Sequence, residues 1–158
     1  MTAPRKDFMD RAIAAAFDGM RGGDGGPFGA LVSRGEEVLA VASNRVLARN
    51  DPTAHAEVEA IRDACAKLAT FDLSGCDLYA TCEPCPMCYA AALWARVDRV
   101  IHACDRQDAA RAGFDDAELH REMEKAPRDR ALLLVPFERD AALAVFREWL
   151  AKPDRRLY

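Results

Sequence analysis

The 158-residue chain has no long hydrophobic run. Its apolar stretches, such as residues 12–17 and 131–135, are far shorter than the roughly 20 residues that a membrane-spanning helix needs. The region between Arg5 and Asp10 mixes basic and acidic side chains, and the N-terminus contains no apolar core of a signal peptide. We therefore expect a cytoplasmic protein with no membrane partner.

The chain also has no run of basic residues longer than the pair Arg155-Arg156, and its formal net charge is −4. Proteins that bind nucleic acids usually carry a basic face or tail, because contacts to phosphates are mostly electrostatic. The charge balance therefore favours a small-molecule substrate over a nucleic-acid partner. The six cysteines could form three disulfides, but without a secretion signal they are better interpreted as free thiols or metal ligands.

Hydrophobic periodicity predicts one α/β domain that spans residues 1–158. We expect a three-layer α/β/α sandwich around a five-stranded mixed sheet, because helices alternate with short apolar strands and parallel strands need such crossovers. The expected helices are residues 8–20, a helix that begins after 51–53, 86–96, 105–125 with a break near Gly113, and 140–151. The expected strands are 29–32 and 38–42, which form a hairpin, then 78–81, 97–103 and 131–135.

Two short motifs carry candidate metal ligands. The first is His55-Ala56-Glu57, and the second is Pro84-Cys85-Pro86-Met87-Cys88, which follows Cys82. Together they match the H-x-E…P-C-x-x-C pattern that is established for zinc nucleobase deaminases. A catalytic zinc site needs three protein ligands and one open position for water. His55, Cys85 and Cys88 would supply the ligands for one zinc ion, and Glu57 would handle protons.

Each motif is expected to open a helix, which explains how these residues could converge. Cys85 and Cys88 are three positions apart, so both side chains lean toward the N-terminal end, where the helix dipole favours a thiolate. His55 and Glu57 are separated by roughly 200° around a regular helix and cannot share a face. They can serve one ion only if it lies beyond the N-terminal end of their helix.

Other interpretations of these residues remain open at this point. The cysteines could be buried thiols or a redox pair, and His55 could be an ordinary core histidine. Glu57 could compensate the helix dipole, as we assume for its neighbour Glu59. If Cys82 were a fourth ligand, the site would be closed and structural, with no chemistry.

Further segments carry a closer resemblance to bacterial guanine deaminases of the cytidine-deaminase superfamily. They are Gly25-Gly26-Pro27-Phe28-Gly29-Ala30, residues 50–57, residues 82–88, Trp94-Ala95-Arg96, residues 108–116 and the terminal Tyr158. The first three are shared with tRNA adenosine deaminases and fungal-type cytosine deaminases. The segment Ala112-Gly113-Phe114-Asp115-Asp116 and the terminal tyrosine distinguish the guanine enzymes.

This resemblance implies a purine pocket around the zinc site, made by Phe28, Asn44, the backbone of Ala56, Trp94, Asp116 and Tyr158. Aromatic rings would contact the purine faces, the Asp116 carboxylate would accept from N–H groups of guanine, and the Asn44 amide would donate to a ring acceptor. Each residue also has a plainer alternative. Phe28 and Trp94 could belong to the core, Asn44 could be a turn residue, and residues 115–116 could cap a helix. Tyr158 could be a frayed end.

The resemblance also implies the reaction and the assembly. The reaction would be hydrolytic deamination of guanine to xanthine and ammonia. The alternatives are a nucleoside such as guanosine, a related ring such as a triazine, a tRNA adenosine, or a zinc or redox protein without catalysis. Guanine deaminases of this type form homodimers that exchange a C-terminal segment, which would begin here at about residue 105. The segment between Glu118 and Arg139 departs most from the family pattern.

Overall fold

The computed structural model describes residues 3–157, and it divides into two compact units between Glu118 and Leu119. Within the described residues, no helix is both long and apolar enough to cross a membrane. The predicted site residue Tyr158 lies outside the described part of the chain.

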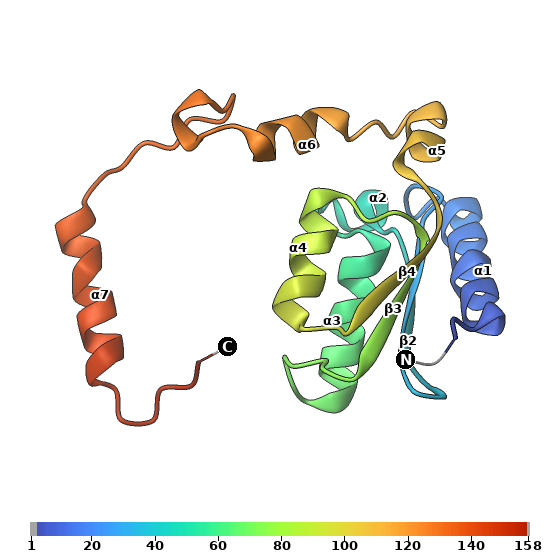
Figure 1. The fold of residues 1–158 in the computed structure, drawn as a ribbon, viewed down its shortest axis with the longest axis horizontal. Coiled ribbons are helices and arrows are strands. Elements are labelled where there is room, and N and C mark those ends of the chain that lie inside the picture. The colour runs from blue at the N-terminus through green and yellow to red at the C-terminus, as the bar shows by residue number, and fades with distance from the viewer. Residues whose placement is uncertain (1–2, 158) are drawn as a thin grey trace. The chain divides into compact units, whose positions relative to one another are not determined.

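The N-terminal unit is built on a four-stranded mixed sheet (Figure 1). Its strands are β1 (Gly29–Arg34), β2 (Glu37–Ser43), β3 (Cys76–Cys82) and β4 (Arg99–Cys104). They lie in the order β2-β1-β3-β4, in which β1 is antiparallel to both neighbours and β3 is parallel to β4. The parallel pair brings the ends of β3 and β4 together, so that Cys82 and Cys104 are register partners.

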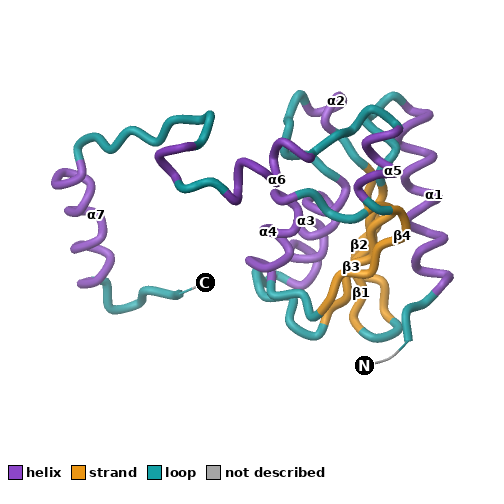
Figure 2. Tube along the Cα trace, turned by 45° about the horizontal axis from the view of Figure 1, so that its top comes forward, coloured by secondary structure: helices purple, strands orange, loops and turns teal. Residues whose placement is uncertain are grey.

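Helices cover both faces of this sheet, which confirms the three-layer sandwich. The helices of the unit are α1 (Lys6–Gly22), α2 (Val46–Arg49), α3 (Ala56–Leu68), α4 (Pro86–Ala95) and α5 (Arg106–Arg111). Helix α1 lies on one face, and α3 and α4 lie on the other (Figures 1 and 2). Between α3 and the sheet, small side chains such as Ala60 and Ala64 are fully buried, so the helix packs close to the strands.

The packing of α1 follows from its apolar spacing. Phe8, Ala12, Ala16 and Gly19 are buried on one side of the helix, at intervals of three and four residues. At the centre of this contact, a Cβ on Gly29 of β1 would lie 2.0 Å from the carbonyl oxygen of Ala12. Only glycine therefore allows the helix and the strand to approach this closely.

The C-terminal unit differs from the prediction in one element. It contains most of α6 (Ala117–Glu124), a short 3₁₀ helix (Pro127–Asp129) and α7 (Arg139–Ala151). The predicted break near Gly113 is present, since Gly113 has a φ of 93° and separates α5 from α6.

The prediction of a fifth strand at residues 131–135 is wrong for this structure, whose described residues form four strands. The run is apolar enough for a strand, but a strand also needs a neighbouring backbone to pair with. The unit from residue 119 onward contains helices and irregular segments only, and Leu132 and Leu133 are 80% and 73% exposed.

Candidate active site

The site lies where the N-termini of α3 and α4 meet. His55 is the N-cap of α3 and Cys85 is the N-cap of α4, and both have extended backbones. Pro86 explains this conformation at Cys85, because a proline disfavours the helical region for the residue before it and fits the first turn of a helix. Because His55 precedes the first helical residue, the angle of roughly 200° between His55 and Glu57 that a regular helix would impose does not apply. Both side chains can therefore lie near the same ion.

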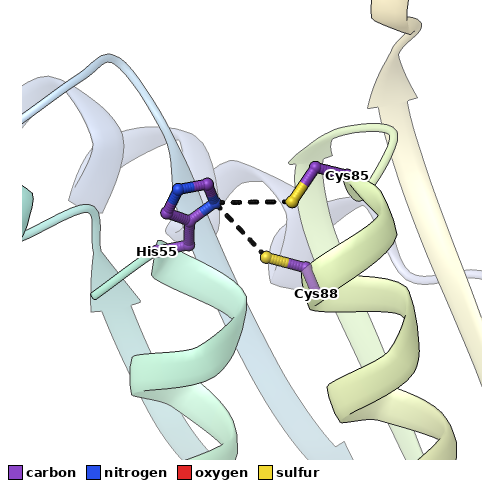
Figure 3. A group of neighbouring side chains, drawn as sticks. All are labelled: His55, Cys85 and Cys88. Atoms are coloured by element: carbon purple, nitrogen blue, oxygen red, sulfur yellow. Dashed lines mark hydrogen bonds between the residues drawn. The ribbon is translucent and has the colours of Figure 1, made fainter. Parts of the chain in front are cut away.

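Three donor atoms converge in the gap between these helices (Figure 3). The Nδ1 atom of His55 lies 3.6 Å from Sγ of Cys85 and 3.4 Å from Sγ of Cys88. All three atoms lie within 4.8 Å of one another. One imidazole nitrogen and two sulfurs are a donor set that zinc prefers, and three ligands leave a tetrahedral ion with one position for water. The residues therefore fit a catalytic zinc ion.

The remaining cysteine of the motif, Cys82, is outside this cluster. Its Sγ donates to the carbonyl oxygen of Asp105 at 3.3 Å. Burial raises the pKa of the Cys82 thiol to about 11, so this sulfur stays protonated at neutral pH. Among the described residues, the group that could hold a metal consists of His55, Cys85 and Cys88, which argues against a closed site with four ligands.

Mutual hydrogen bonds set the charges in the cluster. A hydrogen bond from the Cys88 thiol, and another from His55, lower the pKa of Cys85 to about 4. The same bond to Cys85, together with burial, raises the pKa of Cys88. The bond with Cys85 also raises the pKa of His55. The cluster therefore holds a thiolate at neutral pH, so the Cys85 sulfur can bind a metal ion without first losing a proton.

Glu57 lies beside this cluster on the first turn of α3. Its residue is 6% exposed, and the Cys88 thiol donates to its Oε2 at 3.5 Å. Burial raises the pKa of the Glu57 carboxyl, which makes it a stronger base than an exposed glutamate. A basic carboxylate next to the ligand sulfurs is well placed to exchange protons with a water molecule or a substrate at the ion.

Comparison with known proteins identifies the family. Residues 3–104 match the family described as the cytidine and deoxycytidylate deaminase zinc-binding region. The chain belongs to this deaminase family. Zinc is therefore the metal of the site, and the cluster of His55, Cys85 and Cys88 suits one zinc ion per chain.

Within this family, two guanine deaminases match the chain over nearly its whole length. The enzyme of Bacillus subtilis is 41% identical over 151 residues, which cover 96% of this chain and 97% of the relative. Its X-ray structure has a TM-score of 0.93 and covers 99% of both chains at 40% identity. A guanine deaminase structure from Nitrosomonas europaea, 30% identical, covers 96% of this chain and 87% of the other with a TM-score of 0.68.

A tRNA-specific adenosine deaminase from Agrobacterium fabrum matches a smaller part. It is 44% identical over 101 residues, or 63% of this chain and 65% of the relative. More than a third of the chain is therefore outside that match. The deaminase core is common to both kinds of enzyme, and the two matches over nearly the whole chain described above are to guanine deaminases.

Two of the predicted substrate-binding residues, Asn44 and Ala56, lie between the end of β2 and the first turn of α3. Asn44 is 5% exposed, and its Oδ1 accepts from the backbone N–H groups of Gly26 and Val46, each at 3.2 Å. Ala56 is the first residue of α3, where backbone N–H groups have no partner within the helix. The amide of Asn44 thus joins the glycine loop before β1 to the turn after β2, as a turn residue would.

The aromatic and acidic candidates are placed less uniformly. Phe28 packs partly against the main core and makes an edge-on contact with Phe114, with ring centroids 5.0 Å apart. Trp94 is 67% exposed near the end of α4, so it is not part of the core of the N-terminal unit. Asp116 is half-buried just before α6, while its neighbour Asp115 accepts from the N–H of Ala117 at 2.9 Å and so caps that helix.

Two features of the site region were missed from sequence. Phe114 was recognised only as part of a family segment, although a Cβ on Gly26 would lie 3.1 Å from the rings of both Phe114 and Phe28. From the sequence, Glu59 is expected only to compensate the helix dipole, but it is 3% exposed and paired with two arginines. The signal for the first is an aromatic after a glycine turn. For Glu59, the i,i+3 spacing indicates the pair with Arg62, but no local signal indicates the pair with Arg49.

Proposed function

We propose that this protein hydrolyses the 2-amino group of guanine and releases xanthine and ammonia. The observation that carries the proposal is the match to a guanine deaminase over 96% of the chain, together with the ligand cluster beside Glu57. A purine base also suits the acidic charge balance, since it needs no basic surface.

Glu57 is the residue that would move protons. Bound zinc lowers the pKa of a water ligand to about 7, which supplies a nucleophile at neutral pH. The Oε2 atom of Glu57 would accept the proton from that water as C2 of guanine is attacked. The protonated carboxyl would give this proton to the ring nitrogen, and it would then take the second proton from the oxygen added at C2 and pass it to the departing amine. The C–N bond breaks as ammonia leaves, and the carbonyl of xanthine forms.

The purine would be held by groups on both sides of the cluster. Because Oδ1 of Asn44 accepts from two backbone N–H groups, its NH₂ group is the part that can donate to a ring acceptor. We assign the aromatic side chains of Phe28, Trp94 and Tyr158 to the ring faces. The backbone of Ala56 and the Asp116 carboxylate are assigned to polar edges of the base.

We also propose a cytoplasmic homodimer in which the segment from about residue 105 is exchanged. The support is that no described residue from 119 onward is buried, although α7 and the run before it carry large apolar side chains. A segment with this composition needs an apolar surface from outside itself. In an exchanged dimer, Tyr158 would complete the pocket of the partner subunit.

A nucleoside or triazine remains the second candidate substrate, because pocket width beyond C2 decides between a base and its ribosylated form. The deciding experiment measures ammonia release from guanine, guanosine, cytosine, cytidine and adenine, with zinc content determined in parallel. We expect release from guanine that depends on bound zinc. Release from guanosine in preference to guanine would replace the substrate, and release from cytosine alone would contradict the purine assignment while leaving the mechanism intact.

Action on a tRNA adenosine predicts a different result. Such an enzyme would bind tRNA in a salt-dependent complex, because phosphate contacts release counterions. We expect no tRNA complex with this protein even at low salt.

A further inference from the structure

Glu59 is a second buried carboxylate on α3, two positions beyond Glu57, and the proposed chemistry does not use it. Its Oε2 lies 2.7 Å from Nη2 of Arg49, the last residue of α2, and its Oε1 lies 2.9 Å from Nη1 of Arg62. A buried charge is costly unless it is paired and hydrogen-bonded. Here each carboxylate oxygen has its own guanidinium, so the carboxylate joins two different elements.

The ion pair between Glu59 and Arg49 holds α2 in place. That helix has four residues, which is too short to be stable without tertiary contacts. At its start, the N–H of Val46 donates to Asn44, and at its end Arg49 pairs with Glu59. Helix α2 is therefore held at its start by the side chain of Asn44 and at its end by the side chain of Glu59.

The ion pair between Glu59 and Arg62 extends to the loop that precedes His55. Nη1 of Arg62 lies 3.8 Å from Oδ2 of Asp51. Oδ1 of Asp51 accepts from the N–H of Thr53 at 2.8 Å and from its hydroxyl at 2.7 Å. Thr53 in turn accepts at its carbonyl oxygen from the N–H of His55 at 2.8 Å. The turn that delivers the metal ligand is thus linked to the same carboxylate.

We propose that Glu59 is a positioning residue that sets the placement of Asn44 relative to Glu57 and the metal ligands. It touches neither the substrate nor the metal, and it acts by holding α2 and residues 50–54 against α3. The kinetic part of this inference rests on the proposed function, because it takes Asn44 to bind the purine. The structural part of the inference, that Glu59 holds α2 in place, does not rest on the proposed function.

The expected effect follows from how strongly rates depend on placement. A displacement of about 1 Å between substrate and catalytic groups can cost roughly 10²-fold in rate. Glu59→Gln keeps the shape of the side chain but removes the charge that both arginines need. We expect kcat/KM for guanine to fall about tenfold, mainly through KM, with zinc content unchanged.

The experiment compares Glu59→Gln with Arg49→Met and with a control, Glu37→Gln. Glu37 pairs with Lys67 of α3 at 3.0 Å, so the control breaks an ion pair on the same helix without touching α2. Each variant is assayed for kcat, KM and zinc, and amide hydrogen exchange is followed for residues 44–54. We expect faster exchange and higher KM in Glu59→Gln and Arg49→Met, and neither change in the control.

Arg49→Met and Glu59→Gln should also be non-additive, because they break the same contact. If Glu59→Gln does not fold, Arg49→Met still reports on how α2 is held, since the Arg49 side chain is 45% exposed and its replacement leaves the core unchanged. Lower thermal stability with unchanged KM and unchanged exchange in residues 44–54 would overturn the inference and leave Glu59 a purely structural residue. If the wild-type protein did not act on guanine, the proposed function would fail, while the exchange data would still decide the role of Glu59.

Discussion

The two units of this molecule contain similar kinds of residue but use them differently. In the N-terminal unit, apolar side chains from α1, α3, α4 and the strands β1, β2 and β3 are buried on the two faces of the sheet. In the C-terminal unit, Leu134, Val135 and Phe146 are 63%, 77% and 65% exposed. The metal cluster thus belongs to a unit with its own core, whereas the C-terminal unit has no buried residue among those described. We infer that zinc binding depends on the first unit, which also contains every predicted substrate-binding residue except Tyr158.

The largest effect is expected from a change within the metal cluster of the N-terminal unit. Cys85→Ser replaces a thiolate with a hydroxyl that does not ionise, so zinc and activity should both be lost. The matched control is Cys82→Ser, which should keep zinc because Cys82 is directed to the carbonyl of Asp105. Elemental analysis of both purified variants checks this. Full zinc in Cys85→Ser would mean that the ligand set is misassigned.

The second prediction separates metal binding from proton transfer. Glu57→Gln keeps the volume of the side chain but cannot accept a proton, so zinc should be retained and turnover should fall by at least about 10²-fold. Zinc content and the rate of ammonia release are measured on the same sample. A rate close to that of the wild type would show that another group moves the protons.

The third prediction concerns zinc affinity and pH. Without metal, the pKa of His55 is raised and the pKa of Cys88 is raised, while that of Cys85 is lowered to about 4. Zinc binds a neutral imidazole and two thiolates, so below the pKa of His55 it must displace about two protons, from His55 and Cys88. Affinity should therefore fall roughly 10²-fold for each pH unit lost in that range.

Competition with a chromophoric chelator at several pH values between about 5 and 6.5 tests this slope, because this range lies below the ordinary pKa of histidine and so below the raised pKa of His55. The direction follows from the raised values, since the protonated forms that exclude zinc gain population as the pH falls. A tenfold change per unit would correspond to one displaced proton and would contradict the expectation that both His55 and Cys88 are protonated before zinc binds. No change with pH would contradict the ligand assignment.

The smallest expected effect is in the C-terminal unit. Leu134→Asp should leave zinc content unchanged and raise the dimer dissociation constant at least about tenfold, because an interface leucine contributes roughly 1.5–3 kcal/mol. Sedimentation equilibrium compares it with Arg128→Ser, a change at an exposed polar position of the same unit. A wild-type protein that is monomeric at micromolar concentrations would contradict the exchanged dimer.

Most of the N-terminal unit could be predicted from sequence because its signals are local. Apolar spacing predicted the helix at residues 8–20, and the Gly22–Pro27 loop correctly ended it. The proline after Cys85 predicted a helix start, and that start holds the metal ligand. For such elements, a few neighbouring residues determine the backbone.

The features that could not be predicted depend on contacts between distant segments. A run of five apolar residues at 131–135 looks the same whether or not a strand edge is available, so it was wrongly assigned to the sheet. The pairing of Glu59 with Arg49, and the contact of Phe114 with Phe28, join residues 10 and 86 positions apart in the sequence. Helix periodicity contains no information about either contact.

The central claim is that zinc is held by three side chains of the N-terminal unit and keeps one position for water. Zinc K-edge X-ray absorption on the active protein measures the ligands directly, because zinc–sulfur bonds of about 2.3 Å are resolved from zinc–nitrogen bonds of about 2.0–2.1 Å. We predict two sulfurs per zinc, with nitrogen or oxygen in the remaining positions. Three sulfurs per zinc would place Cys82 on the ion, close the site and contradict the deaminase mechanism.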